Sequence, residues 1–251
     1  MGIPSRAGVT QLVECDLAKV DVAGSNPVSR SKKNARRDSS MMKRLAILSC
    51  VALGAAFSLF AQDYKLEPIS SGPPDVPAAI AGAIQTRGYR VVGPKGPWCE
   101  IWFRKSIPPG PKPTDDSIAF AISQGTLLGV LRFPGQGADR RDQVIKPGVY
   151  TLRYSNYPVD GAHQGVAPQR DFALMTPIAN DTDPNAAPDF NTLVQWSIKA
   201  SGTTHPAVLS IETPMGKTFP TLGKEGESDW SLSVKIGDLP FAIILVGKVQ
   251  A

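Results

Sequence analysis

Short apolar-rich runs follow one another along the chain from residue 89 onwards, and some alternate with the two-residue period of β-strands. The clearest case is WSLSVKI (residues 230–236), in which Trp230 and every second residue after it are apolar. A strand of this kind buries one face and exposes the other, as in antiparallel sheets. FAIILVGKV (residues 241–249) is apolar on both faces, which predicts a central strand that is buried on both sides.

Eight further segments, separated by Pro- and Gly-rich turns, have the length and composition of strands. They cover residues 89–93, 99–105, 117–122, 126–133, 148–154, 171–178, 192–200 and 207–213. One helix is expected in DVPAAIAGAIQTRG (residues 75–88), where Asp75 can cap the start, Pro77 suits the first turn and Gly88 follows the end. Ten strands and one short N-terminal helix predict an all-β fold, a single antiparallel β-sandwich of jelly-roll or immunoglobulin-like type.

The stretch IKPGVYTLRY, from Ile145 to Tyr154, places a Pro-Gly turn before a strand in which Tyr150 and Leu152 are two residues apart. It resembles a sequence segment found in uncharacterised secreted bacterial β-sandwich proteins. The resemblance covers these ten residues. It implies the sandwich fold and carries over no functional residue.

Residues 1–40 fit neither the helical nor the strand period. Back-translation offers an explanation, because GSNPVS (Gly24–Ser29) can be encoded by codons containing GGTTCGAATCC, which resembles the T-arm of a transfer-RNA gene. QLVE, from Gln11, can come from a D-arm, and the codons of Asp16–Val20 can form a stem around a GCC anticodon. This segment therefore resembles a translated glycine transfer-RNA gene, and we expect a spurious or disordered extension.

Residues 41–61 have the three parts of a secretory signal peptide: a basic start, an apolar run (Leu45–Phe60) and the small Ala61. The apolar run is shorter than the ~20 residues that a membrane-spanning helix needs. We expect an exported protein, periplasmic or extracellular, with no stable membrane span in the mature chain. Residues 62–251 are then one β-sandwich domain.

The net charge and the cysteine count are different once residues 1–61 are left out. The whole chain has 27 Lys+Arg and 22 Asp+Glu, but residues 1–61 hold nine and four of these, leaving 18 of each. A neutral mature chain gives no support to nucleic-acid binding, so no nucleic-acid partner is expected. Cys99 is the one cysteine of residues 62–251, which excludes an internal disulfide and predicts a buried, inert thiol.

The segment 154–174 is the main candidate for a binding site, because it joins two predicted strands through an unusually long connection. An imidazole beside carboxylates, a guanidinium and aromatic rings can bind a ligand, hold a metal or act as a general base. The alternative is plain loop architecture, with a turn at Asp160 and an ion pair between Arg170 and Asp171. The candidate ligand-binding residues are Tyr157, Asp160, His163, Arg170 and Asp171.

Motifs for catalysis or cofactor binding do not accompany these residues. The sequence has no HExxH, no GxSxG and no phosphate-binding loop, and the second histidine, His205, lies in a separate turn. NDTDPNAAPD (residues 180–189) is rich in oxygen ligands but lacks the EF-hand spacing. We therefore expect no catalytic residue, no cofactor and no metal.

The function that this sequence predicts is that of an exported, non-enzymatic module that binds a small molecule or a protein partner through its loops. The alternative is a hydrolase or metal-dependent enzyme centred on His163 and the neighbouring carboxylates. The position of His205 relative to His163 would separate the two hypotheses, because an enzyme needs its groups within reach of one another in one pocket.

Overall fold

The computed structural model describes residues 63–113, 115–158 and 170–248, in which strands predominate. The strands are β1 (Lys65–Ile69), β2 (Gly88–Gly93), β3 (Gly96–Phe103), β4 (Leu127–Phe133), β5 (Gly137–Ala138), β6 (Val144–Ile145), β7 (Gly148–Asn156), β8 (Asp171–Pro177), β9 (Val208–Glu212), β10 (Thr221–Glu225), β11 (Asp229–Ile236) and β12 (Leu239–Val246). The helices are α2 (Ala78–Ala83), the 3₁₀ turn η1 (Ile178–Asn180) and α3 (Phe190–Ser201). No helix within the described ranges is long and apolar enough to span a membrane.

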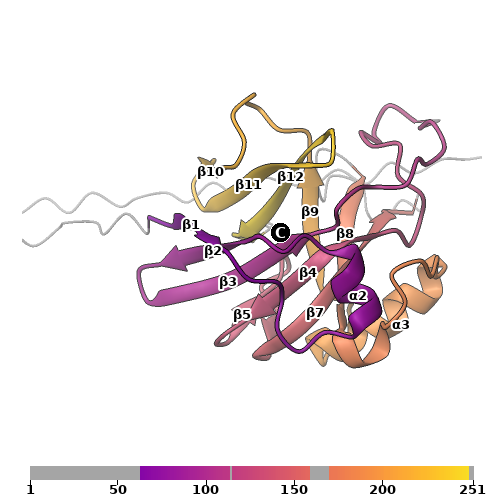
Figure 1. Ribbon diagram of the computed structural model, residues 1–251, viewed down its shortest axis with the longest axis horizontal. Coiled ribbons are helices and arrows are strands. Elements are labelled where there is room, and N and C mark those ends of the chain that lie inside the picture. Colours follow the sequence, from indigo (N-terminus) through magenta and orange to yellow (C-terminus); the bar gives the residue numbers. More distant parts are fainter. Residues whose placement is uncertain (1–62, 114, 159–169, 249–251) are drawn as a thin grey trace, which may run out of the picture. The chain divides into compact units, whose positions relative to one another are not determined.

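Ten strands form one antiparallel sheet in the order β1-β2-β3-β4-β7-β8-β9-β12-β11-β10, while β5 and β6 form a separate pair. The end strands β1 and β10 approach each other without a hydrogen-bonded ladder, so the sheet is nearly closed into a barrel (Figure 1). The prediction of an all-β, antiparallel fold is confirmed. The two sheets of a sandwich are not confirmed, because the ladder continues through all ten strands.

Eight of the ten predicted strands are present, as β2, β3, β4, β7, β8, β9, β11 and β12. The prediction missed the two end strands, β1 and β10, whose sequences KLEPI and TLGKE mix charges with Pro or Gly. It also placed a strand at 117–122, where the chain runs irregularly although Phe120 and Ile122 are buried. These two side chains join the core from a loop, which explains why the segment has the composition of a strand.

The predicted strand 192–200 is wrong, because these residues lie in helix α3. The Asp189 side chain accepts a hydrogen bond from the Thr192 backbone N–H at the start, and Gly202 ends the helix with φ +64°. Leu193, Ser197 and Ala200 are buried at helical spacing. Phe190 and Trp196 pack against the same cluster as Leu193, so the apolar face of the helix is present and is interrupted by the polar Ser197.

The predicted helix near the N-terminus is present but short, spanning Ala78–Ala83. Asp75 does not cap it: Asp75 has φ +57°, Pro77 occupies the N-cap position, and no side chain caps the first turn. Ile80 is buried against Trp102, as is Ile84 just past the end of the helix. The helix thus covers part of the sheet through two isoleucines.

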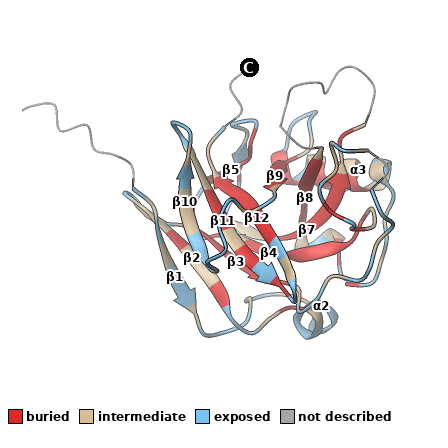
Figure 2. Ribbon diagram, turned by 90° about the horizontal axis from the view of Figure 1, so that it is seen from above, coloured by how far each residue is buried: buried red, intermediate tan, exposed pale blue. Residues whose placement is uncertain are grey.

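The main core fills the interior of the curved sheet and joins its two halves. Phe241 of β12 contacts Phe103 of β3 and Phe120, with ring centroids 6.0 Å and 5.6 Å apart. Cys99 is fully buried, as predicted, and burial raises the pKa of its thiol. Figure 2 shows that burial concentrates in the central strands, while β1 and β10 are largely exposed or intermediate.

Strand β11 confirms part of its predicted alternation. Leu232, Val234 and Ile236 are buried in the core, whereas Trp230 is only half-buried and packs on Tyr64, with ring centroids 5.6 Å apart. The pairing with β12 shifts between Trp230 and Ser231, and such a bulge breaks the period-two rule. Trp230 therefore lies at the rim of the core and not inside it.

Arg153 of β7 and Asp181 form an ion pair that is shielded from solvent. Their side chains are 0 % and 1 % exposed, and Nε and Nη2 of Arg153 donate to the two carboxylate oxygens at 2.6 Å and 2.7 Å. The remaining N–H groups of Arg153 donate to the backbone carbonyl oxygens of Gly125, Asp183 and Ala186. The oxygen-rich segment 180–189 is thus held by an arginine.

Candidate ligand-binding groove

Three of the five predicted site residues lie in the described part of the chain, while Asp160 and His163 lie outside the described residues. Tyr157 stacks on Phe172 with ring centroids 4.2 Å apart and planes 17° apart. Its backbone N–H donates to the Arg170 carbonyl oxygen at 2.9 Å. Tyr157 is 8 % exposed, so its ring is packed into the fold.

Arg170 pairs with Asp115 and not with its neighbour Asp171. Its Nη1 lies 2.7 Å from the Asp115 carboxylate, and its Nε donates to the Tyr157 carbonyl oxygen. Hydrogen bonds from Ser117, and then from Arg170, hold the pKa of Asp115 below its usual range. The guanidinium therefore fastens the segment 115–117 to the end of β7.

Asp171 is fully buried, and both of its carboxylate oxygens accept hydrogen bonds. The Tyr154 hydroxyl donates at 2.5 Å and the Ala119 backbone N–H at 2.8 Å. Burial, and then the bond to Asp171, raise the pKa of Tyr154. These contacts tie the irregular 117–122 segment to β7 and β8; a ligand-binding role for the predicted set stays a prediction.

His205 lies exposed in the turn after α3. Its backbone carbonyl accepts hydrogen bonds from the Ser201 and Thr203 hydroxyls, which shape the turn. The question of a shared site with His163 falls outside the described residues. The described hydrogen bonds of His205 therefore stabilise the turn.

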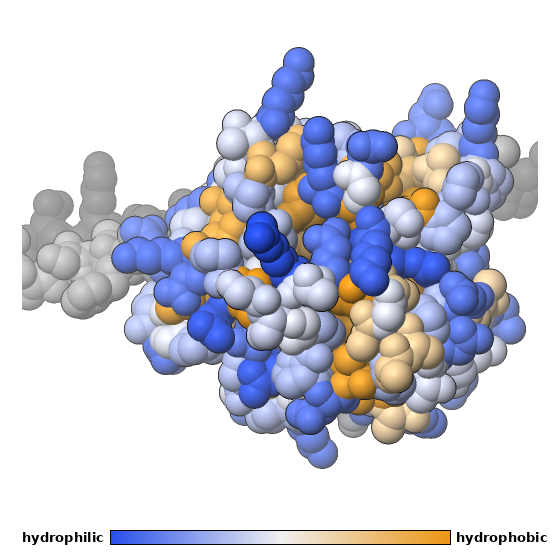
Figure 3. Space-filling view, viewed as in Figure 1, coloured by the Kyte–Doolittle hydropathy of each residue, from blue (hydrophilic) through white to orange (hydrophobic). Residues whose placement is uncertain are grey.

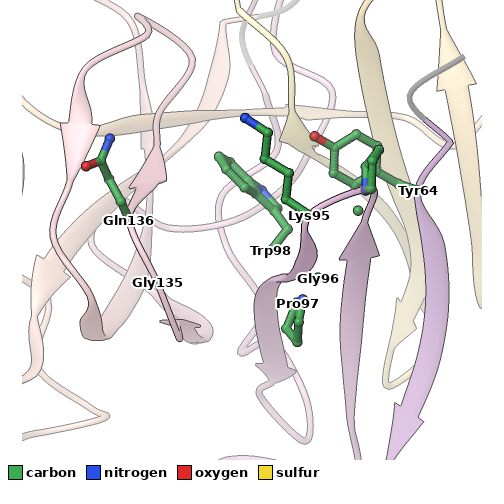
Figure 4. A pocket seen from close by; sticks show the side chains of 9 residues that line it. Tyr64, Lys95, Gly96, Pro97, Trp98, Gly135 and Gln136 are labelled. Carbon is green, nitrogen blue, oxygen red and sulfur yellow. The ribbon is translucent and has the colours of Figure 1, made fainter. Parts of the chain in front are cut away.

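A groove of about 430 Å³ lies where two turns meet at one end of the curved sheet. Its lining residues come from the stretch before β1, from the β2–β3 turn and from the β4–β5 connection: Tyr64, Gly93, Pro94, Lys95, Gly96, Pro97, Trp98, Gly135 and Gln136. Antiparallel pairing of β1, β2, β3 and β4 brings these three segments to the same edge. Figure 4 shows Trp98 between Gln136 on one side and Tyr64 on the other.

Glycines shape the groove. Gly96 has φ +108°, a conformation that suits the tight turn carrying Lys95. A Cβ on Gly93 would lie 2.6 Å from the Tyr64 ring, so this glycine lets the tyrosine pack across β2. A Cβ on Gly135 would meet nothing within 4 Å, which leaves the opposite side of the groove open.

The two aromatic walls are held in place by the core. The Trp98 indole N–H donates to the Leu245 carbonyl oxygen at 2.9 Å, and its ring meets Phe133 edge-on at 5.8 Å between centroids. The Tyr64 ring packs on Trp230, and burial raises the pKa of the Tyr64 phenol. Trp98 and Tyr64 are both partly buried, so each presents one fixed aromatic surface.

Polar groups at the rim complete the groove. The Lys95 side chain is exposed at the tip of its turn and has no acidic partner among the described residues, and Gln136 is exposed on the opposite side. Among the described residues, the lining contains no carboxylate, imidazole, thiol or serine hydroxyl. Apolar walls with a few polar groups are typical of a ligand site.

Sequence reasoning missed this groove because Tyr64 is positioned by β1, which begins at the next residue and was not predicted. A usable signal was the stretch GPKGPW (residues 93–98), which places a lysine between two turn glycines and close to a tryptophan. A neighbouring hollow of about 400 Å³ lies at the seam between β1 and β10 and shares Tyr64 with the groove. Tyr64 thus separates two hollows.

No protein-family model matches the chain, and no match was found among curated proteins or solved structures.

Proposed function

We propose that this chain is an exported, non-enzymatic binding module that takes a small ring-shaped ligand in the groove between Tyr64, Trp98 and Gln136. The observation that carries this proposal is the pair of aromatic walls fixed by core contacts. A flat aromatic ring binds the face of a sugar or another ring, while Lys95 and Gln136 supply hydrogen bonds and a positive charge at the edge. We therefore expect a ligand with one apolar face and an acidic or hydroxyl-rich rim.

A small ligand is favoured over a protein partner by the character of the surface. On the face in view, Figure 3 shows hydrophobic areas that are interrupted by hydrophilic side chains, the broadest of them at the lower right. Protein-binding faces more often present a contiguous apolar patch. The groove, in contrast, has the size of a ligand site.

The alternative of a hydrolase or metal-dependent enzyme centred on His163 has less support. Of its candidate carboxylates, Asp171 is described, and it is fully buried with both oxygens hydrogen-bonded inside the fold. A catalytic base has to reach its substrate directly or through one water molecule. Binding is therefore the function that we prefer.

The finer architecture and the export of the protein belong to this proposal as well. β3 and β12 face each other across one core, as the two layers of a flattened sandwich of jelly-roll or immunoglobulin-like type would. The secretory pattern of residues 41–61 supports export. N-terminal sequencing of the protein from a periplasmic extract should begin at Gln62, and an intact leader would argue against export.

Calorimetry with glucuronate, glucose and phenylacetate tests the binding function. We expect millimolar or tighter binding of at least one, with an acidic probe favoured because of Lys95. Gly135→Leu fills the groove without a clash and should abolish this binding, whereas Gly72→Leu, which also has open space around its Cβ position but lies outside the groove, should keep it. Equal binding by both variants, or no binding of any probe, would contradict the proposal.

A further inference from the structure

A further pocket, of about 270 Å³, lies on the outer face of β10 and β11. Alternation along β11 sends Leu232 and Val234 into the core and leaves Ser231 and Ser233 on the opposite face, where both line the pocket. Gly223 pairs with Ser231 and adds no side chain. The chain around Met215, whose side chain is 85 % exposed, borders the other side.

Two carboxyl groups meet beside this pocket. Glu225 of β10 lines it, and its side chain is hydrogen-bonded to that of Glu212 at the end of β9. Carboxyl groups bond to each other only while one of them keeps its proton. Burial, and then the contact with Glu225, raise the pKa of Glu212 to about 7. The pair can therefore exchange its proton for another cation near neutral pH.

The basic side chains nearby do not neutralise this pair. The charge of Arg140 lowers the pKa of Glu212, and the charge of Asp229 raises it. Arg140 is paired with Asp229, since its Nη1 lies 2.9 Å from the Asp229 carboxylate. Lys224 is also among the lining residues, but it precedes Glu225 on β10, so strand alternation directs its exposed side chain to the opposite face of the strand. Within the described ranges, Glu225 thus lines the pocket with Glu212 bonded to it, and neither carboxyl group forms an ion pair.

Ser231 gives an independent indication of a ligand site. It is 2 % exposed, and its Oγ has no hydrogen-bond partner among the described residues. Buried polar groups in folded proteins are nearly always hydrogen-bonded, and an unpaired one is costly. Since Ser231 lines the pocket, a polar group bound there would satisfy its hydroxyl.

We propose that this pocket binds a small organic cation through a primary ammonium group, whose N–H donors satisfy the Glu212–Glu225 pair and the Ser231 hydroxyl. An ammonium group has three donors and no acceptor, which matches two carboxylates and a hydroxyl. Met215 offers apolar surface to the aliphatic part of the ligand. A metal ion fits less well, because the described residues hold no group of three His, Cys, Asp or Glu placed for one.

Binding of the cation displaces the shared proton, so affinity rises with pH. Because the pair releases its proton near pH 7, the Kd of an ammonium ligand at pH 6 should be about tenfold higher than at pH 8. Butylammonium chloride is a suitable probe, and the backbone amide signal of Ser231 reports its position by NMR. Tetramethylammonium has the same charge but no N–H donor, and it should bind at least tenfold more weakly.

Two variants test the site while leaving the fold in place. Gly223→Leu meets nothing within 4 Å of its Cβ, fills the pocket and should abolish butylammonium binding; Gly82→Leu, equally open but located on α2, should not. Glu225→Gln removes the charge and should remove both the binding and its pH dependence. The inference is overturned if butylammonium does not bind at pH 8, if tetramethylammonium binds equally well, or if Gly223→Leu binds like the wild type. None of these outcomes would bear on the proposal that the groove around Trp98 binds a ligand.

Discussion

Trp98 is oriented before any ligand arrives, because its indole N–H is already bonded to the Leu245 carbonyl on the far side of the core. A side chain that is held in its binding orientation loses less conformational entropy when a ligand binds. The opposite case is Arg170, which looks available in the sequence but is committed to Asp115, 55 positions away along the chain. Such long-range partners decide which polar side chains are left for function.

Glu212 makes the stability of the protein depend on pH. Its folded pKa is raised to about 7, whereas the unfolded side chain ionises near 4.5, so the folded state binds more protons between these values. Stability from this group is present below pH 4.5 and is lost as the pH rises to 7. In Glu212→Gln, denaturant unfolding at pH 4.5, 6 and 8 should show less decline than in the wild type.

Glu227→Gln is the matched control for this measurement, because Glu227 is exposed in the β10–β11 turn. Its pH profile should follow that of the wild type. If the free energy of unfolding of Glu212→Gln declines with pH as steeply as that of the wild type and of Glu227→Gln, the carboxyl pair does not share a proton.

The ion pair between Arg153 and Asp181 fixes the 181–186 segment to β7. Arg153→Met leaves the buried carboxylate of Asp181 without its cationic partner, so we expect a loss of about 3–5 kcal/mol in the free energy of unfolding. The exposed pair of Lys248 and Asp142 is the control, and Lys248→Met should cost less than about 1 kcal/mol. Equal losses in denaturant melts would show that burial does not govern the Arg153 pair.

At the scale of elements, the apolar strands of the sheet's interior were predictable and its edges were not. β4 and β12 are apolar runs that could only be buried. β1 and β10 carry Pro68, Gly223 and several charges, because an end strand packs few side chains and tolerates such residues. Helix α3 was mistaken for a strand because Thr192, Val194 and Ile198 are β-branched, although Asp189 at its start and Gly202 at its end are residues that cap helices.

The cap of α3 can be tested directly. Asp189 accepts a hydrogen bond from the Thr192 backbone N–H at 2.8 Å, and this bond holds the pKa of Asp189 below its usual value. Asp189→Ala should lower the free energy of unfolding at pH 7, while Asp189→Asn, which can still cap, should cost much less. Equal losses would show that the side chain does not stabilise the helix start.

At the scale of the whole molecule, the groove is a product of topology. Tyr64, Lys95 and Gln136 are far apart in the sequence and meet because β1 to β4 are neighbours in one antiparallel sheet. The sequence could therefore predict the fold class but not this site, and the predicted loop segment 154–174 drew attention through its length and composition. In the structure, its described ends serve to join β7, β8 and the 115–122 segment.

The most direct test of the account is to follow the indole N–H signals of the protein by NMR while glucuronate is added. Trp98 lines the groove, whereas Trp102 is buried under α2 and Trp196 lies on α3. We predict that the Trp98 signal shifts in a saturable manner while the Trp102 and Trp196 signals stay in place. Saturable binding that moves the Trp196 signal and leaves Trp98 unchanged would contradict the assignment of this groove as the ligand site.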